Sequence, residues 1–291
     1  MCRLARVSRA GFYRGWEAKA PDEAELAFRA EIQKVALAHR RRYGYRRVLE
    51  DLRNSGMVLG KYRLQRIMRE DNLLAIRHRK FILTTDSQHE CQVYLNLAAR
   101  MTLTGINQLW VADITYIRLR REFVYLAVVI DRFSRKVVGW ALDKTLVSRL
   151  VMEALQKALE TRQPAAGLVH HSDRGVQYAC ADYTQLLSAH GITPSMSRPA
   201  NPYDNAACES FMKTLKQEEI YCNEYRDFAD LSAHLQEFLE HYYNRQRLHS
   251  ALGYRTPEEF EKSCSPPTAG QIQNAASVAF FTPPPAKDTA A

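Results

Sequence analysis

Three strand-like segments lie close together in the middle of the chain and restrict the folds it can adopt. Residues 109–117 alternate between apolar and polar positions, residues 123–131 form a buried apolar run, and residues 136–142 form a third segment. The short connections between them are typical of antiparallel neighbours. The sequence therefore predicts a three-stranded antiparallel meander.

Helices and strands alternate after this meander. Helical patterns at 148–161 and 181–190 separate two short strands, at 167–172 and 192–197. The order βββαβαβα predicts an α/β fold with a mixed sheet and helices packed on its faces.

Asp113 departs from the pattern of the first strand. Asp is disfavoured inside strands, and strict alternation puts this carboxylate on the same face as Val111 and Thr115. A carboxylate on such a face is costly unless it is paired or binds a cation. Asp113 is therefore a candidate metal ligand, although a structural role is also open.

The stretch 201–216 predicts a turn that leads into a helix. The Asp-Asn pair at 204–205 can accept hydrogen bonds from the first turn. Glu209 lies near the helix start, with Lys213 and Lys216 further along the same side. The expected apolar stripe consists of Cys208, Phe211, Leu215 and Cys222.

Asp113, Asp173 and Glu209 form a stronger pattern together than any of them does alone. Asp173 follows the strand 167–172, where functional loop residues are common, although a turn or N-cap role is also open. The sequence between Asp173 and Glu209 is 35 residues long. Three oxygen ligands without a thiolate suit Mg²⁺ or Mn²⁺, and we expect two such ions in a phosphoryl-transfer site.

These motifs resemble transposases of bacterial insertion sequences in the retroviral-integrase (DDE) superfamily. The resemblance is stronger to the second-reading-frame product of elements with two overlapping frames, and it covers about residues 24–261. The motifs that carry it are WVADITYI, HHSDRGVQY, NPYDNAACESFMKTLKQE and YNRQRLHSALGYRTPEEF.

The resemblance implies a ribonuclease-H-like core whose catalytic, metal-binding triad is Asp113, Asp173 and Glu209. It also places Lys216 near the active site. The implied activity is DNA strand cleavage followed by strand transfer from a 3′-hydroxyl. The alternatives are a ribonuclease-H-like nuclease that does not join strands and an inactive DNA-binding regulator.

A concentrated positive charge precedes the predicted core. Residues 40–80 contain thirteen Lys/Arg and four Asp/Glu, a net charge of +9. The whole chain has the same net charge of +9. Helical patterns at 45–54 and 61–71 in this region predict a helix-turn-helix that binds DNA, although a solvated surface is also open. The predicted DNA-binding residues are Lys216, Lys213, Arg46, Arg47, Lys61, Arg63, Arg66, Arg69 and Arg247.

These patterns predict five consecutive regions along the chain. They are a partial helix-turn-helix-like segment at 1–23, a basic helix-turn-helix domain at 24–80, a linker at 81–104, an integrase catalytic domain at 105–262 and a disordered tail at 263–291.

Four residues near the predicted site have two interpretations each. His170 and His171 either orient substrate or a carboxylate, or pack at the end of their strand. Asn244 and His249 either contact DNA or hold the last helix on the core.

The remaining features concern location and partners. Six cysteines without a C-x-x-C pair argue against a zinc module and fit a reducing compartment. The longest apolar run, 123–130, is too short to span a bilayer. We expect a soluble, cytoplasmic, nucleoid-associated protein. Its expected partners are the terminal inverted repeats of the element, target DNA, further copies of the chain and the upstream-frame product.

Overall fold

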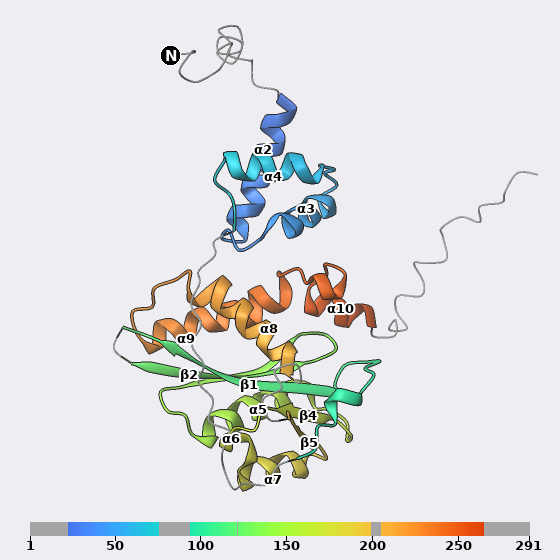
Figure 1. The fold of residues 1–291 in the computed structure, drawn as a ribbon, viewed down its shortest axis with the longest axis vertical. Coiled ribbons are helices and arrows are strands. Elements are labelled where there is room, and N and C mark those ends of the chain that lie inside the picture. Colours follow the sequence, from blue (N-terminus) through green and yellow to red (C-terminus); the bar gives the residue numbers. More distant parts are fainter. Residues whose placement is uncertain (1–22, 76–93, 121, 199–204, 265–291) are drawn as a thin grey trace, which may run out of the picture. The chain divides into compact units, whose positions relative to one another are not determined.

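The computed structural model of the chain describes residues 23–75, 94–120, 122–198 and 205–264 (Figure 1). Its contacts form two units, one of residues 1–85 with 209–227 and one of residues 86–208 with 228–291. The sequence predictions for the N-terminal segment before residue 23, most of the linker, the Asp204 cap and the C-terminal tail lie outside the described residues. The predicted domain boundaries stay predictions.

The second unit is built on a five-stranded sheet with the order β3-β2-β1-β4-β5. β3, β2 and β1 are antiparallel neighbours, whereas β1, β4 and β5 run parallel. The predicted meander and mixed sheet are therefore confirmed. The strands are β1 (Leu109–Arg118), β2 (Phe123–Asp131), β3 (Val137–Asp143), β4 (Val169–Ser172) and β5 (Thr193–Met196).

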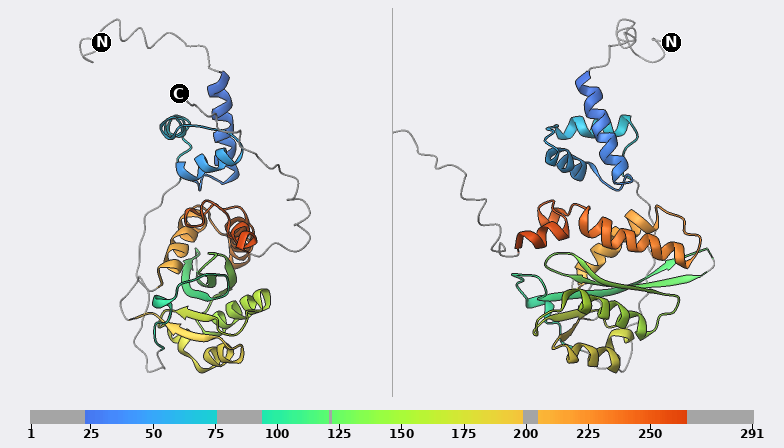
Figure 2. Two further views of the ribbon diagram at one scale, coloured as in Figure 1. Left: turned by 90° about the vertical axis from the view of Figure 1, so that its right-hand side faces the viewer. Right: turned by 180° about the vertical axis from the view of Figure 1, so that it is seen from behind.

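Helices cover both faces of this sheet (Figures 1 and 2). The helices α5 (Ser148–Arg162), α6 (Val176–Ala179) and α7 (Ala181–Ala189) lie on one face. On the other face α9 (Phe228–Gln236) continues as the π-helical segment η4 (Glu237–Tyr243). The short helices η1 (Ala98–Arg100) and η5 (Ser250–Leu252) and the helix α10 (Pro257–Cys264) complete the unit. The sequence did not predict α6 or the π-helical turn.

Side-chain hydrogen bonds fix the C-terminal part of this unit. The Asn244 amide donates to the Val137 carbonyl and accepts from the Val137 N–H, each at 3.0 Å. This geometry supports the structural interpretation of Asn244. At the start of α10, the Thr256 N–H donates to Glu259 and the Glu259 N–H donates to the Thr256 hydroxyl. These two bonds form a capping box.

The first unit contains α2 (Glu23–Ala38), α3 (Tyr45–Asn54) and α4 (Lys61–Glu70). Gly56 ends the α3 segment with a φ of 80°, a conformation that side-chain-bearing residues rarely adopt.

α8 (Ala206–Leu215) begins in the second unit and ends in the first, where it continues as the π-helical segment η3 (Lys216–Ile220). Cys208, Phe211 and Leu215 are buried, as the stripe predicted. Including Cys222 in that stripe was wrong. The π-helical segment ends at Ile220, so Cys222 lies in the turn that follows and not on the helix.

A buried ion pair joins two distant parts of the sequence within the first unit. The Arg42 guanidinium contacts the Glu219 carboxylate, and the two side chains are 6% and 2% exposed. Arg42 Nε also donates to the Glu218 carbonyl at 2.7 Å. The Asn223 amide and the Tyr225 hydroxyl complete the hydrogen bonds to Glu219. The charge of Glu219 is thus compensated on several sides.

Replacing Arg42 by Ala is expected to lower the free energy of unfolding by about 3–5 kcal/mol, because it leaves a buried carboxylate without its cation. Urea denaturation of the two proteins measures the difference. Arg53→Ala is the matched control, since the Arg53–Glu50 pair is at the surface, with the arginine 55% exposed. The control is expected to lose no more than about 1 kcal/mol. Equal losses in both variants would contradict the role of Arg42.

His170 is a buried polar residue inside the core of the second unit. It is 1% exposed, and its Nε2 lies 3.0 Å from the Tyr183 hydroxyl. Burial, with a smaller contribution from the neighbouring His171, lowers the pKa of His170 to about 3. The imidazole therefore stays neutral under conditions that protonate it in the unfolded chain, where its pKa is about 6.5.

This difference predicts how stability depends on pH. As pH falls below about 6.5, the unfolded chain takes up a proton that folded His170 does not, so stability decreases by up to about 1.4 kcal/mol per pH unit. The loss continues down to about pH 3. His170→Gln is expected to reduce the slope of unfolding free energy against pH, measured by urea denaturation between pH 4 and 7. The exposed His190, replaced by Gln, is the control. An unchanged slope in His170→Gln would contradict the assignment.

Candidate active site

The register of two parallel strands aligns Asp113, in the middle of β1, with Asp173, just after the end of β4. Val111 of β1 pairs with His171 of β4. Continuing this register by two positions puts Asp173 beside Asp113, just after β4 ends at Ser172. The sheet changes from antiparallel to parallel pairing at β1. The carboxyl ends of parallel strands at such a change are where α/β proteins bind ligands.

Short hydrogen bonds fix both carboxylates locally. Asp113 Oδ1 accepts from the Ile114 N–H, and Asp173 Oδ1 accepts from the Gly175 N–H, each at 2.9 Å. The second bond closes a turn in the SDRG segment, so Asp173 has both a turn role and a place beside Asp113. A Cβ at Gly175 would lie 3.0 Å from Asp173 Oδ1, so the glycine makes room for the carboxylate.

The electrostatic environment shows that the two aspartates share neighbours. Burial raises the pKa of Cys208 well above its usual value, and the negative charges of Asp113 and Asp173 raise it further. The pKa of Tyr178 is also raised by burial first, and then by Tyr183 and the same two aspartates. Asp113 and Asp173 therefore act on one buried region that contains Cys208.

Asn205 attaches the beginning of α8 to β1 next to Asp113. Its side chain is buried, and its Nδ2 donates to the Ala112 carbonyl at 3.2 Å. Within the described part of the chain, its Oδ1 has no hydrogen-bond partner, so Asn205 does not supply the predicted helix cap. The sequence did not predict the contact with Ala112, because spacing along the chain does not show which strand faces a helix start.

Glu209 follows Cys208 directly on α8 and is exposed to solvent. It belongs to the first unit, whereas Asp113 and Asp173 belong to the second. Its position beside the two aspartates remains a prediction. Lys213 is exposed and Lys216 is half-buried at the beginning of the π-helical segment η3.

The donor atoms of this region fit a hard cation. Oxygen atoms of Asp113 and Asp173, with the Asn205 Oδ1 nearby, are of the type that Mg²⁺ and Mn²⁺ prefer. Within the described ranges, no three His, Cys, Asp or Glu side chains form a preassembled metal site.

Acidic side chains neutralise several of the predicted DNA-binding arginines. Glu25 of α2 contacts Arg66 at 3.0 Å and Arg63 at 3.5 Å. Arg66 also contacts Glu70 at 3.3 Å. The two pairs made by Glu25 connect α2 with α4.

Two further arginines make contacts inside their own units. Arg47 contacts Glu218 at 3.1 Å. Arg247 is 4% exposed, lies over the Tyr243 ring and is 3.5 Å from His249. The burial of Arg247 favours a packing role for it and for His249.

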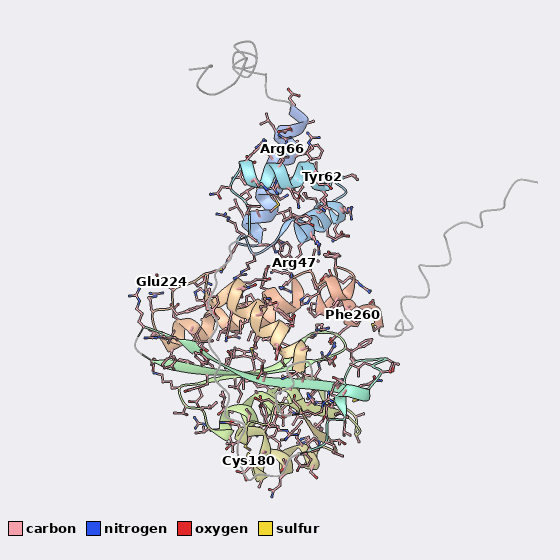
Figure 3. The ribbon with its side chains drawn as sticks, in the orientation of Figure 1. Arg47, Tyr62, Arg66, Cys180, Glu224 and Phe260 are labelled. Atoms are coloured by element: carbon pink, nitrogen blue, oxygen red, sulfur yellow. The ribbon has the colours of Figure 1, made fainter. Side chains whose placement is uncertain are left out.

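Other basic residues accompany two tyrosines at the beginnings of α3 and α4, the half-buried Tyr45 and the exposed Tyr62. Lys61 lies over the rings of Tyr45 and Tyr62, at 5.8 and 5.4 Å. Arg46 also lies over Tyr45 and donates to its hydroxyl, which lowers the pKa of Tyr45. Tyr62 is 81% exposed, and Figure 3 labels it at the start of α4, about one turn before Arg66. We refer to Tyr45, Arg46, Lys61 and Tyr62 as the basic-aromatic surface.

The domain families that match the chain agree with this architecture. The HTH-like domain family matches residues 22–81, and two integrase core domain families match residues 104–202 and 190–257. In solved structures, a chain of the simian T-cell lymphotropic virus intasome in complex with PP2A regulatory subunit B56 gamma has a TM-score of 0.47. The two chains are 20% identical, and the similarity covers 77% of each. Across the described ranges, every helix is too short or too polar to span a lipid bilayer.

Curated relatives match the chain along most of its length. An uncharacterized 31 kDa protein of insertion element IS600 from Shigella sonnei is 37% identical, over 90% of this chain and 97% of the relative. The transposase InsF for insertion sequence IS3A from Escherichia coli strain K12 is 36% identical, over 90% and 92%. Such identity across nearly whole chains, with the ribonuclease-H-like mixed sheet, shows that the chain belongs to the insertion-sequence transposases with an integrase core domain.

Proposed function

We propose that the chain cleaves one DNA strand at the end of its element and joins the freed 3′-hydroxyl to another phosphodiester. The observation that carries this proposal is the parallel register of β1 and β4, which aligns Asp113 with Asp173 when it is continued by two positions. The charges of both aspartates raise the pKa of Cys208, after burial has raised it first. Glu209 directly follows Cys208 in the chain. Membership of the transposase family supports DNA as the substrate.

Asp113, Asp173 and Glu209 would hold Mg²⁺ or Mn²⁺, and we propose two ions. The buried Cys208, whose pKa is raised, is disfavoured as a thiolate ligand. Such ions, when bound, supply positive charge at the attacking and leaving oxygens of an in-line displacement.

Other side chains would hold the substrate rather than react with it. The exposed Lys213 and the half-buried Lys216 carry ammonium groups that bind phosphates as point charges. Asn205 holds the beginning of α8 on β1 through the Ala112 carbonyl. A water or DNA 3′-hydroxyl is the nucleophile in this proposal, so no Ser or Tyr of the chain has to form a covalent intermediate.

We propose that the basic-aromatic surface contacts DNA. Two cationic side chains accompany the exposed ring of Tyr62 and the half-buried ring of Tyr45 there, a combination that suits phosphate contacts and packing against sugars and bases. Arg63 and Arg66 face carboxylates instead, so they contribute less to phosphate binding.

Transposition brings two element ends together, so we propose that at least two copies of the chain act on DNA. The upstream-frame product is a proposed fused or separate partner. In this proposal the complex works in the bacterial cytoplasm, next to the nucleoid.

Asp113→Asn, Asp173→Asn and Glu209→Gln are each expected to reduce strand cleavage and strand transfer by at least about 100-fold. Removal of an outer partner of a metal site lowers activity by about 10–100-fold. Each of these substitutions removes a charged ligand itself, so we expect a larger loss of activity. Labelled element-end DNA with Mg²⁺ and an unlabelled target measures both reactions.

Asp182→Asn is the matched control, because it removes one carboxylate from an exposed position on α7. Full activity in all three triad variants would contradict the site assignment. Cleaved product without joined product would instead identify a nuclease, which is the alternative that the sequence left open.

Lys61→Ala is expected to weaken DNA binding more at low than at high salt. Removal of one phosphate contact reduces the slope of log affinity against log salt concentration by about 0.9. Fluorescence anisotropy with a DNA duplex between 50 and 200 mM salt, about the range over which this dependence is usually seen, measures the slope. Arg66→Ala, in the same helix, is the control and is expected to retain the wild-type slope. A smaller slope in the control alone would assign the phosphate contact to Arg66 and contradict the role of Lys61.

A further inference from the structure

His171 connects two strands through both of its ring nitrogens. Its side chain is fully buried near the end of β4. Nδ1 lies 2.8 Å from the Ser195 hydroxyl, and Nε2 lies 3.1 Å from the Ser197 hydroxyl. Ser195 belongs to β5, and Ser197 follows the end of that strand. The proposed mechanism has assigned no role to this histidine.

The neighbouring hydrogen bonds determine the direction of this connection. The Ser197 hydroxyl donates a hydrogen bond to the Ser172 carbonyl at 3.3 Å. Because its single hydrogen is used there, it accepts the hydrogen bond from His171 Nε2–H. Nδ1 of His171 is then unprotonated and accepts a hydrogen bond from the Ser195 hydroxyl. Ser195 in turn accepts from the Leu97 N–H at 2.9 Å. The chain of hydrogen bonds therefore runs from Leu97 through His171 to Ser172, and the tautomer follows from the network.

This chain of hydrogen bonds ends at the residues that flank Asp173. The Ser172 carbonyl also accepts from the Ser197 N–H at 3.0 Å. On the other side of Asp173, Arg174 Nε donates to the Ser197 carbonyl at 2.8 Å. Both neighbours of Asp173 are thus tied to the same serine, which His171 orients.

We propose that His171 is a positioning residue that holds the carboxylate of Asp173 in place for metal binding. This inference rests on the proposed role of Asp173 as a metal ligand. His171 acts through Ser197 and the backbone of Ser172, without contact to the metal. Outer groups that orient metal ligands commonly affect metal affinity by about 10–100-fold.

Two substitutions of His171 separate its two hydrogen bonds. The amide of Asn corresponds in reach to Nδ1 of histidine, so His171→Asn retains the bond to Ser195 and loses the bond to Ser197. The amide of Gln corresponds to Nε2, so His171→Gln retains a donor to Ser197. If His171 acts through Ser197, His171→Gln preserves metal binding and His171→Asn does not.

The experiment is titration of the full chain with Mn²⁺, followed by electron paramagnetic resonance to obtain the dissociation constant. His171→Asn is expected to weaken Mn²⁺ binding by about tenfold or more. Ser197→Ala, a smaller change, is expected to weaken it similarly, whereas His171→Gln stays near the wild type. Tyr183→Phe is the matched control, because it removes the buried bond to His170 on the same strand without touching Ser197.

Each result has a distinct meaning. Wild-type affinity in His171→Asn and Ser197→Ala, together with weakened binding in Asp173→Asn, would overturn the positioning role and leave the proposed function intact. Wild-type affinity in Asp173→Asn would overturn the ligand assignment and the positioning role with it. Equal weakening in Tyr183→Phe and His171→Gln would indicate general loss of packing and would also overturn the proposal. Melting temperatures of all variants report their folding separately.

Discussion

The parallel pairing of β1 with β4 determines where the proposed active site lies. Side chains alternate between the two faces of a strand, so a slip of one residue would turn every side chain of β4 to the opposite face. The observed register pairs Val111 with His171, and continued by two positions it aligns Asp113 with Asp173. The pairing of β4 with β5 sets His171 opposite Ser195, within hydrogen-bond reach of Ser195 and Ser197. Two neighbouring backbone pairings therefore position the two aspartates and the hydrogen bonds around Asp173.

Local sequence patterns predicted the strands and the unusual position of Asp113, because alternation and propensity are properties of neighbouring residues. They did not show how a second carboxylate is accommodated. Asp131, at the end of β2, is fully buried, yet it accepts from the N–H groups of Asn107, Phe133 and Ser134. A buried aspartate can thus be satisfied by backbone alone. The pattern around Asp113 therefore supports a proposed functional carboxylate only in combination with Asp173 and Glu209.

Charge was harder to interpret than hydrophobic periodicity. Arg46 and Arg66 belong to the same excess of positive charge in the sequence, but one contacts a tyrosine ring and the other contacts Glu25. Helix packing determines that difference, and Glu25 is about forty positions away in the chain. The π-helical turns escaped prediction for a related reason. They shift the helical period by a fraction of a turn, which packing determines and local sequence does not.

The contact between Arg42 and Glu219 has a consequence for anyone who divides this chain into fragments. The HTH-like match ends at residue 81, whereas Glu219 lies within the second integrase match. A fragment cut at that limit would separate a buried guanidinium from its carboxylate and leave both pieces with an uncompensated charge. The HTH-like match covers residues 22–81, whereas the packed unit also includes residues 209–227. Truncated proteins designed from those limits would be poor substitutes for the intact chain.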